Sequence, residues 1–286
     1  MIDLHTHSTY SDGTLTPAEL VDLAKKNGVS ALALCDHNTV DGLSAFLDAA
    51  RERGLEAVPG TEFSADYAGG EVHILGLFIE PEHYGAVREL LAQALERKAE
   101  SNRLLIRNLA KDGICLDYDA LQAAMPGGLV NRAVIAGQMV RQGYCKSVQE
   151  AFKKWLAPEL GYFIPPRRLD AMEVIRFIRS VGAVSVLAHP YLNLTDEQLP
   201  CFLAEATEAG LDAMETHYSK FTPEQTEKAE KLVREFGLLP SGGSDFHGEN
   251  KPDIELGRGR GDLWVPPEIL EALKARRRNL RNLVNI

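Results

Sequence analysis

The sequence predicts an α/β fold, either a β/α barrel or an open doubly wound sheet, that is interrupted by a helical insertion. Three observations support this prediction. Short apolar runs alternate with amphipathic helical patterns along most of the 286 residues. The alternation stops over residues 86–165, where helical patterns follow one another. Histidines and carboxylates cluster where the apolar runs end, which is where β/α folds place their functional residues.

The first third of the chain contains two successive strand, loop and helix patterns. The run IDLHTHS is short and alternating, the turn residues SDGTLTP follow, and PAELVDLAKKNGV predicts a helix with Pro17 in its first turn and Gly28 at its end. The run ALALC predicts a buried strand, DHNTVDG a polar loop, and LSAFLDAARERG a helix closed by Gly54. LEAVPGTEFSAD predicts a further strand followed by a loop.

Further strands are predicted on both sides of the helical region. EVHILGLF precedes it, and three helical patterns then lead to the strand-like run GYFIPP at residues 161–166. The first helical pattern is long enough to contain a break or bend. A helix over residues 170–181 precedes the strands AVSVLAHP, LDAMETHY and LLPSGGSDFH. We therefore assign a barrel domain to residues 1–98 and 166–286, and a helical cap domain to residues 99–165.

Composition excludes several classes of protein. The chain has 45% hydrophobic and 25% charged residues, which is typical of a globular protein and not of a disordered one. It lacks a signal-peptide pattern and any run of 18 apolar residues, so we expect a cytoplasmic protein with no membrane association. No obligate protein partner is indicated. The four cysteines are spaced too widely for a metal motif, and we expect them to be reduced: Cys35, Cys115, Cys145 and Cys201.

Charge argues against non-specific binding to nucleic acid or to an anionic membrane. The formal net charge is -10, so an anionic substrate requires local positive charge. The basic run KARRRNLRN near the C-terminus is typical of the solvated face of a last helix.

Nine histidines and carboxylates indicate a metal site. His5 and His7, two residues apart on the first strand, project from the same face. His73 lies within a predicted strand, and most of the others follow strand ends. Each residue alone is more often a core or surface residue, but one multinuclear metal site explains all of them together. The candidate ligands are His5, His7, Asp12, His37, Glu62, His73, His189, Asp245 and His247.

The motifs HTHSTYSDGTLTP, DHNTVDG, PGTEFS, VHILG, LAHP and GSDFH resemble, in this order, those of the PHP (polymerase and histidinol phosphatase) family of metal-dependent phosphoesterases. The resemblance covers nearly the whole chain and implies a distorted seven-stranded β/α barrel. The insertion motifs GGLVNRAVIAGQMV, EAFKKWLAP and GYFIPP are similar to the branch of 3',5'-nucleotide bisphosphate phosphatases and the 5'-to-3' exoribonuclease RNase AM. That branch often has a histidine two residues after the Arg of the insertion, where this chain has Val134.

The resemblance implies three ligand sets and two to three divalent ions. The sets are His5, His7, Glu62 and Asp245 for the first ion, Glu62, His73 and His189 for the second, and Asp12, His37 and His247 for the third. Imidazoles and carboxylates without thiolates suit Mn²⁺, Zn²⁺ or Fe²⁺, and the branch resemblance suggests Mn²⁺. Three carboxylates and three divalent ions leave the filled site positively charged, which favours a phosphate substrate.

The same resemblance implies the reaction. We expect removal of the 3'-phosphate of a nucleoside 3',5'-bisphosphate by a metal-bridging hydroxide, giving the 5'-monophosphate, with 5'-to-3' trimming of short RNA as a related activity. The expected catalytic residues are Asp245, as a metal ligand, and His217, either as a proton donor or as a rim histidine. The insertion is expected to close over the barrel mouth and select the substrate. Arg132 is its first candidate for a substrate phosphate, and the weaker substrate-binding candidates are Lys98, Arg103, Arg168 and His217.

Three alternatives to this function remain, and one of them is not an enzyme. One is a phosphatase for another small phosphate monoester, such as histidinol phosphate, although the insertion motifs argue against it. Another is a non-catalytic binding module like the PHP domains attached to replicative polymerases, against which the complete ligand set weighs. An amidohydrolase would use a related barrel, but its expected motifs are missing. Asp36, beside His37, is expected either to orient an imidazole or to cap a loop.

Overall fold

The structure is a computed structural model that describes residues 1–124 and 130–284. The chain forms two compact units. The first consists of Met1–Arg88 and Leu169–Ile286, and the second of Glu89–Arg168. Helix α3 (Tyr84–Ala110) contains the first division point and is one continuous helix of 27 residues without the break that its length allowed.

The first unit is built on a nearly closed barrel of seven strands. They pair in the order β1 (Ile2–Asp3), β2 (Ala31–Leu34), β3 (Glu56–Tyr67), β4 (Gly70–Leu77), β6 (Val184–Leu187), β7 (Ala213–Tyr218) and β8 (Leu239–Gly243). The short strand β5 (Leu169–Asp170) pairs with β3 outside this ring. The N–H of Leu4 donates to the carbonyl of Gly242 at 3.2 Å, which joins the two ends of the sheet. The expected distorted seven-stranded barrel is confirmed.

Strand β3 corrects one prediction made from the sequence. It continues for 12 residues, so Glu62 lies in mid-strand opposite Leu75 and not in a loop. The extension follows from alternation, because Phe63 and Ala65 are fully buried while the polar residues Ser64 and Asp66 alternate with them. Strand β4 is antiparallel to both β3 and β6, whereas the other neighbours along the ring are parallel.

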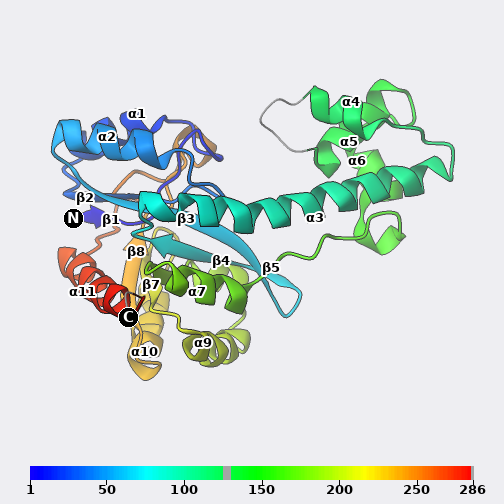
Figure 1. The fold of residues 1–286 in the computed structure, drawn as a ribbon. Helices are drawn as coiled ribbons and strands as arrows, with labels where there is room; N and C mark the ends of the chain where they lie inside the picture. Colours follow the sequence, from blue (N-terminus) through cyan, green and yellow to red (C-terminus); the bar gives the residue numbers. More distant parts are fainter. Residues whose placement is uncertain (125–129, 285–286) are drawn as a thin grey trace. The chain divides into compact units, whose positions relative to one another are not determined.

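Helices lie on the outside of this barrel (Figure 1). They are α1 (Pro17–Lys26), α2 (Leu43–Arg53), α7 (Ala171–Ser180), α9 (Gln198–Ala209), α10 (Pro223–Glu235) and α11 (Pro267–Val284). A capping box between Thr16 and Glu19 starts α1, with Pro17 in its first turn, and Gly54 ends α2 with a φ of 62°. Both helix boundaries agree with the sequence prediction.

Short helical segments connect these elements. They are η1 (Pro81–His83), α8 (Pro190–Asn193) and η4 (Gly248–Asn250), whereas η3 (Pro158–Leu160) belongs to the second unit. Across residues 1–124 and 130–284, no helix combines the length and the apolarity that crossing a bilayer requires. All four cysteines are free thiols, of which Cys35 and Cys145 are buried.

The second unit has its own core of apolar side chains. It contains part of α3 together with α4 (Tyr118–Ala123), α5 (Arg132–Arg141), α6 (Val148–Ala151) and a π-helical turn η2 (Phe152–Leu156). Leu105, Ile135 and Met139 are fully buried there. The strand predicted for GYFIPP is wrong, because residues 161–166 form no strand; two of them are prolines, which have no N–H for a ladder. Gly127, Gly128 and Leu129 of the insertion motif lie outside the described residues.

Candidate metal centre

The structure brings all nine candidate ligands into one cluster within the first unit. Four overlapping groups contain them, and in each group the ligand atoms lie within 4.8 Å of one another. The groups are His7, Asp12, His37 and His247; His5, His7 and Asp245; His5, Glu62 and His189; and His37, Glu62 and His73. The side chains follow β1, β2, β6 and β8 or lie within β3 and β4.

The atoms of the first implied ligand set converge. Oε2 of Glu62 lies 3.1 Å from Nε2 of His5 and 3.2 Å from Nε2 of His7. Oδ1 of Asp245 lies 3.3 Å from the same His7 nitrogen and 3.8 Å from that of His5. The side chains of His5, His7 and Glu62 are completely buried. Two imidazole nitrogens and two carboxylate oxygens therefore surround one point.

The other oxygen of Glu62 faces the second implied set. Oε1 lies 2.7 Å from Nδ1 of His73 and 3.0 Å from Nε2 of His189. The two oxygens of one carboxylate thus face different groups of histidines, which is the arrangement of a ligand shared between two ions.

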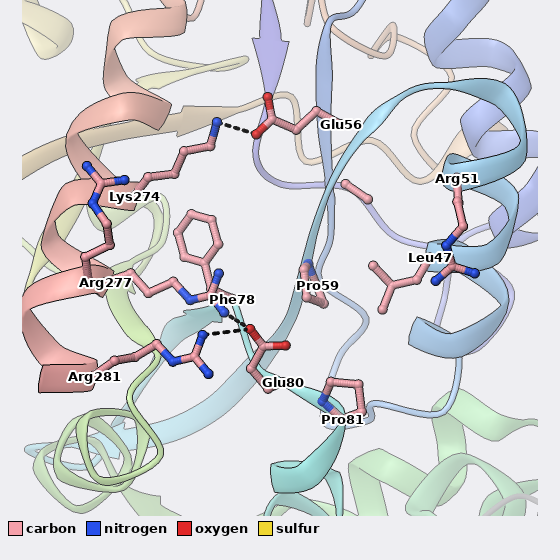
Figure 2. Close-up of a pocket in the computed structure, with 12 residues that line it drawn as sticks. Leu47, Arg51, Glu56, Pro59, Phe78, Glu80, Pro81, Lys274, Arg277 and Arg281 are labelled. Atoms are coloured by element: carbon pink, nitrogen blue, oxygen red, sulfur yellow. Dashed lines mark ion pairs between the residues drawn. The ribbon is translucent and has the colours of Figure 1, made fainter. Parts of the chain in front are cut away.

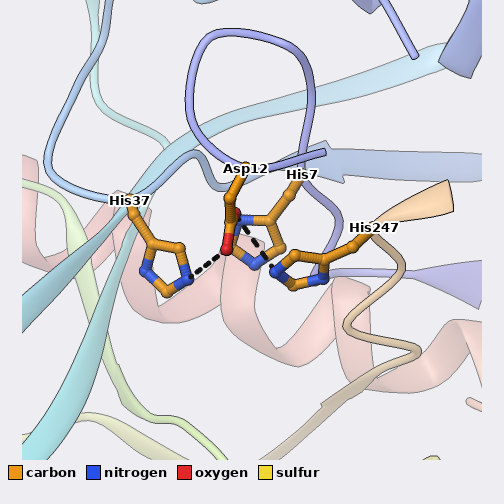
Figure 3. A group of neighbouring side chains, drawn as sticks. All are labelled: His7, Asp12, His37 and His247. Carbon is orange, nitrogen blue, oxygen red and sulfur yellow. Dashed lines mark ion pairs between the residues drawn. The ribbon is translucent and has the colours of Figure 1, made fainter. Parts of the chain in front are cut away.

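The third implied set surrounds Asp12 (Figure 3). Oδ1 of Asp12 lies 3.2 Å from Nε2 of His247, and Oδ2 lies 3.8 Å from Nε2 of His37. Nδ1 of His7 also faces Asp12, at 3.9 Å. His7 therefore stands between the first and third sets, a link that the sequence motifs did not indicate. The Asp12 side chain is 56% exposed, which makes this set the most open of the three.

The donor chemistry of the cluster fits divalent metal ions. Nδ1 and Nε2 of His7 and Nδ1 of His37 are buried and lack hydrogen-bond partners among the described residues. Buried polar atoms are nearly always hydrogen-bonded, so three orphaned imidazole nitrogens in one place call for another partner. A metal ion accepts their lone pairs, and mixed imidazole and carboxylate ligands suit Mn²⁺, Zn²⁺ or Fe²⁺.

The cluster perturbs the pKa values of its own members. Burial raises the pKa of Glu62, but His5 and the other histidines outweigh this effect and hold it well below its ordinary value. Burial opposes the charge on His73, but hydrogen bonds to Glu62 and Glu71 outweigh it and raise the pKa of His73 to about 9. Burial lowers the pKa of His37 to about 4. Protons thus occupy some nitrogens that a metal ion would bind.

Sequence reasoning missed two buried acids behind the cluster. Both oxygens of Glu215, on β7, are used: Oε1 accepts from Nδ1 of His5 at 2.9 Å, and Oε2 accepts from the N–H of His189 at 2.6 Å. Asp3 accepts from the N–H groups of Ser244 and Gly257, each at 2.8 Å. A carboxylate within a predicted strand was the available signal, because buried carboxylates require specific partners.

Asp245 is held by two donors on its outer oxygen. Its φ is 56°, and its Oδ2 accepts from the hydroxyl of Tyr218 at 2.8 Å and from Nζ of Lys251 at 2.7 Å. Lys251 is a cation that the barrel unit itself supplies, whereas the sequence favoured the insertion as the source of cations.

Asp36 accepts from the N–H and Oγ of Ser8 and from Oγ of Ser11, each at 2.7 Å, so it caps the loop that carries Asp12.

The structure does not place His217 with the cluster. Its Nδ1 lies 2.8 Å from Oγ1 of Thr216, and its Nε2 lies 3.9 Å from Glu230 on α10. A bulge between Glu215 and His217 shifts the register of β7, so Glu215 and Tyr218 are the residues of this strand that contact cluster members. His217 is thus outside the cluster, and its catalytic and substrate-binding roles stay predictions.

The cationic candidates of the second unit have structural contacts of their own. Arg132 donates to the Leu156 carbonyl at 3.1 Å, and its guanidinium lies 4.2 Å from the centre of the Phe163 ring. Arg103 lies 4.6 Å from the centre of the Tyr118 ring. The remaining two candidates are exposed: Lys98 and Arg168.

A separate cavity of about 560 Å³ lies between α2, the start of β3 and α11 (Figure 2). Arg51 of α2 lines it, together with basic side chains of the KARRRNLRN run, three of which face carboxylates. Glu80 pairs with Arg277 and Arg281, and Glu56 pairs with Lys274. The run is therefore not simply a solvated face, but its charges are largely used within the fold.

The PHP domain family matches residues 3–163, which is more than half of the chain. This chain belongs to the PHP family. Its barrel and its histidine and carboxylate cluster agree with that membership, and the chain is a metal-dependent phosphoesterase.

Relatives of this PHP chain include an exoribonuclease and a nucleoside bisphosphate phosphatase. The 5'-3' exoribonuclease Rnm of Escherichia coli is 36% identical over 267 residues, covering 92% of this chain and 89% of the relative. The 3',5'-nucleoside bisphosphate phosphatase of Chromobacterium violaceum is 30% identical over 257 residues, covering 88% and 90%. A solved structure from Bifidobacterium adolescentis, described as a metal-dependent phosphoesterase, has a TM-score of 0.68 and 29% identity, covering 96% of this chain and 95% of that one.

Proposed function

We propose that this protein removes the 3'-phosphate from nucleoside 3',5'-bisphosphates and releases the 5'-monophosphate and inorganic phosphate. The observation that carries the reaction class is the nine-residue cluster in which Glu62 faces histidines on both sides. The nucleotide substrate is supported by the named relatives from Chromobacterium violaceum and Escherichia coli.

The proposed metal ions would be held by the three ligand sets described above, and Mn²⁺ is our first candidate. When bound, such ions act as Lewis acids that activate water and neutralise the charge of a phosphate. The chain's own contribution is to fix the ligands before substrate arrives. Glu62 is buried and shared between two sets, and Asp245 is held at its outer oxygen by Tyr218 and Lys251. Rigid ligands keep their spacing during the displacement at phosphorus.

The second phosphate of the substrate requires a further cation. We propose that Arg132 is this cation, since its guanidinium stacks on Phe163 and uses one N–H for the Leu156 carbonyl, leaving other donors available. A stacked guanidinium is already ordered, so less rotamer freedom is lost when a phosphate binds.

A second candidate activity is removal of nucleotides from the 5' end of short RNA. It is favoured by one observation, the 36% identity to the 5'-3' exoribonuclease Rnm over 92% of the chain. The same hydrolytic centre would serve both activities, because a phosphodiester and a 3'-phosphate monoester both require attack of water at phosphorus.

A phosphate-release screen with the Mn²⁺-loaded protein tests these proposals. The panel contains adenosine 3',5'-bisphosphate, histidinol phosphate, a sugar phosphate and a 5'-phosphorylated RNA pentamer. We expect the bisphosphate to have the highest kcat/KM among the monoesters, and mononucleotides to appear from the RNA. A higher kcat/KM for histidinol phosphate than for the bisphosphate would contradict the proposed substrate. Absence of hydrolysis across the panel, with metal bound, would support a binding module.

A further inference from the structure

Glu215 contacts two candidate metal ligands that belong to different ligand sets. It lies on β7 and is fully buried. Its Oε1 is 2.9 Å from Nδ1 of His5, and its Oε2 is 2.6 Å from the backbone nitrogen of His189. His5 belongs to the first set and His189 to the second. Glu215 is absent from the groups of candidate ligands, and among the described residues its hydrogen bonds to the centre are those with His5 and His189.

The contact with His5 selects the tautomer of that ring. A carboxylate can only accept, so Nδ1 of His5 must carry a proton. The lone pair of the neutral ring is then on Nε2, which faces Glu62 at 3.1 Å and Asp245 at 3.8 Å. Glu215 therefore directs the coordinating nitrogen of His5 into the cluster, as outer carboxylates do for metal-binding histidines.

The contact with His189 fixes a backbone conformation that its residue type disfavours. His189 has a φ of 28° and precedes Pro190. Non-glycine residues with positive φ persist only where the surrounding structure holds them. The N–H of His189 donates to Glu215 at 2.6 Å, and its ring then reaches Glu62 with Nε2 at 3.0 Å. The direction of this ring thus depends on the backbone that Glu215 holds.

We propose that Glu215 is a positioning residue that sets the spacing of the first two metal sites from outside the cluster. It joins the ring of His5, at the nitrogen opposite the one that faces Glu62, to the backbone of His189, so the two sets are connected through Glu62 and again through Glu215. This inference rests on the proposed metal centre, although it is independent of which phosphate ester is the substrate.

Glutamine cannot replace Glu215 in this arrangement. Both partners are donors, whereas a glutamine side chain has one acceptor and one donor end. If its oxygen accepts from His189, its NH₂ group faces Nδ1 of His5, and that nitrogen can accept only after its proton moves to Nε2. The coordinating nitrogen of His5 is then blocked. If the amide is reversed, its NH₂ group meets the N–H of His189.

The test compares Glu215→Gln with Asp212→Asn. Asp212 is a matched control, because it is a buried carboxylate three residues away that accepts from Ser185 and Arg276 and has no contact with the ligands in the described structure. Chelator competition measures the Mn²⁺ affinity of each holoenzyme. We expect Glu215→Gln to weaken it by about 10- to 100-fold, the usual loss for an outer-shell partner, and Asp212→Asn to leave it unchanged.

A measurement on the wild-type protein covers the case in which Glu215→Gln does not fold. In the Zn²⁺-loaded protein with ¹⁵N-labelled histidine, long-range ¹H–¹⁵N correlations report which ring nitrogen of His5 carries the proton. We expect the proton on Nδ1. Either the opposite tautomer in the wild type or an unchanged Mn²⁺ affinity in a folded Glu215→Gln variant would overturn the proposal.

The outcomes separate this inference from the proposed function. If the wild type binds metal but does not hydrolyse nucleotides, the substrate proposal fails while the affinity and tautomer results still decide the role of Glu215. With an active wild type, a positioning role predicts that Glu215→Gln lowers kcat with little change in KM, because the substrate contacts remain.

Discussion

Oε1 of Glu62 lies 3.0 Å from Nε2 of His189, although 127 positions separate the two residues in the chain. Glu62 is in β3, and His189 lies two residues after the end of β6. Strand β4 lies between these strands in the barrel and contributes His73 to the same carboxylate oxygen at 2.7 Å. The entire second unit is inserted between β4 and β6, so three neighbouring strands form this ligand set despite the long intervening segment.

Replacement of Glu62 by glutamine should remove the shared ligand of two ions. An amide is a poorer metal ligand than a carboxylate, and both ions depend on this side chain. We expect Glu62→Gln to lower Mn²⁺ affinity and phosphate release by more than about 100-fold, beyond the loss expected for an outer-shell residue. Glu56→Gln, at the exposed start of the same strand, is the control. Normal turnover with full metal content in Glu62→Gln would refute the assignment.

Asp12→Asn should affect one ion selectively. Asp12 contacts His37 and His247 of the third set, and its side chain is 56% exposed. The amide retains one coordinating oxygen but loses the negative charge. At Mn²⁺ concentrations that do not saturate the third set, metal analysis by mass spectrometry should therefore show one ion fewer per chain than in the wild type. The ions of the first and second sets should be retained. Asp41→Asn, an exposed aspartate paired with Arg88, should retain the wild-type stoichiometry. Equal loss of all ions would mean that the sets do not fill independently.

Metal affinity should rise with pH. In the metal-free protein, burial disfavours the charged form of His73, but Glu62 and Glu71 outweigh this effect and raise its pKa to about 9. The ring is therefore protonated at neutral pH, and a metal ion must displace that proton. Below the pKa of such a ligand, each increase of one pH unit raises the metal affinity by up to about tenfold for each proton displaced. Calorimetry in buffers of different ionisation enthalpy should detect proton release on Mn²⁺ binding at pH 7, and a pH-independent affinity between pH 7 and pH 9 would contradict the prediction.

The stability of the metal-free protein should show the opposite trend. The folded-state pKa of His73 is raised above its ordinary value of 6.5, so its stabilising contribution is fully present below pH 6.5. That contribution is lost as the pH rises towards about 9. Denaturant titrations of chelator-treated protein should therefore give a smaller His73 contribution to the free energy of unfolding at pH 9 than at pH 6. His73→Gln should reduce this difference, and an unchanged pH dependence would argue against the prediction.

Arg132→Ala should separate substrate selection from chemistry. Loss of a charge-assisted phosphate contact costs about 1.5 to 3 kcal/mol, or about one to two orders of magnitude in kcat/KM for a nucleoside 3',5'-bisphosphate. A simple aryl phosphate should be hydrolysed at nearly the wild-type rate. Arg132→Lys should rescue only partly, since an ammonium lacks the planar fork that stacks on Phe163.

Two measurements control the Arg132 experiment. Arg141→Ala removes an exposed arginine from the same helix and should leave both activities unchanged. Thermal unfolding of each variant is needed because Arg132 also donates to the Leu156 carbonyl. An equal loss for both esters would assign Arg132 to the stability of the second unit and not to substrate binding.

Local features of the sequence were sufficient for many of these elements. Pro17 in the first turn of α1 and Gly54 at the end of α2 were predicted because helix ends depend on neighbouring residues. His5 and His7 reach one cluster because alternate residues of an extended chain share a face. Residue types at the ends of predicted strands were sufficient to indicate the nine candidate ligands, and the family resemblance divided them into three sets.

The tertiary structure decided which residues support the ligands and how the sets share them. Glu215, not His217, contacts the cluster from β7, because a bulge changes the register of that strand. Local alternation cannot reveal this change, since a bulge depends on pairing with the neighbouring strand. His7 stands between two sets because the segment after β1 folds back on itself, which brings Asp12 to 3.9 Å from its Nδ1, while its Nε2 faces Glu62.

Sequence by itself determined the chemical identities of the ligands and the alternation that builds a barrel. Only the tertiary structure decided their meeting points, because these depend on contacts between strands distant in the chain. Gly243 illustrates the reason. A Cβ at this position would lie 2.4 Å from the backbone nitrogen of His5, so the last strand can approach the first closely only with glycine there. Nothing within the local sequence around residue 243 specifies that neighbour, whereas closure of the barrel does.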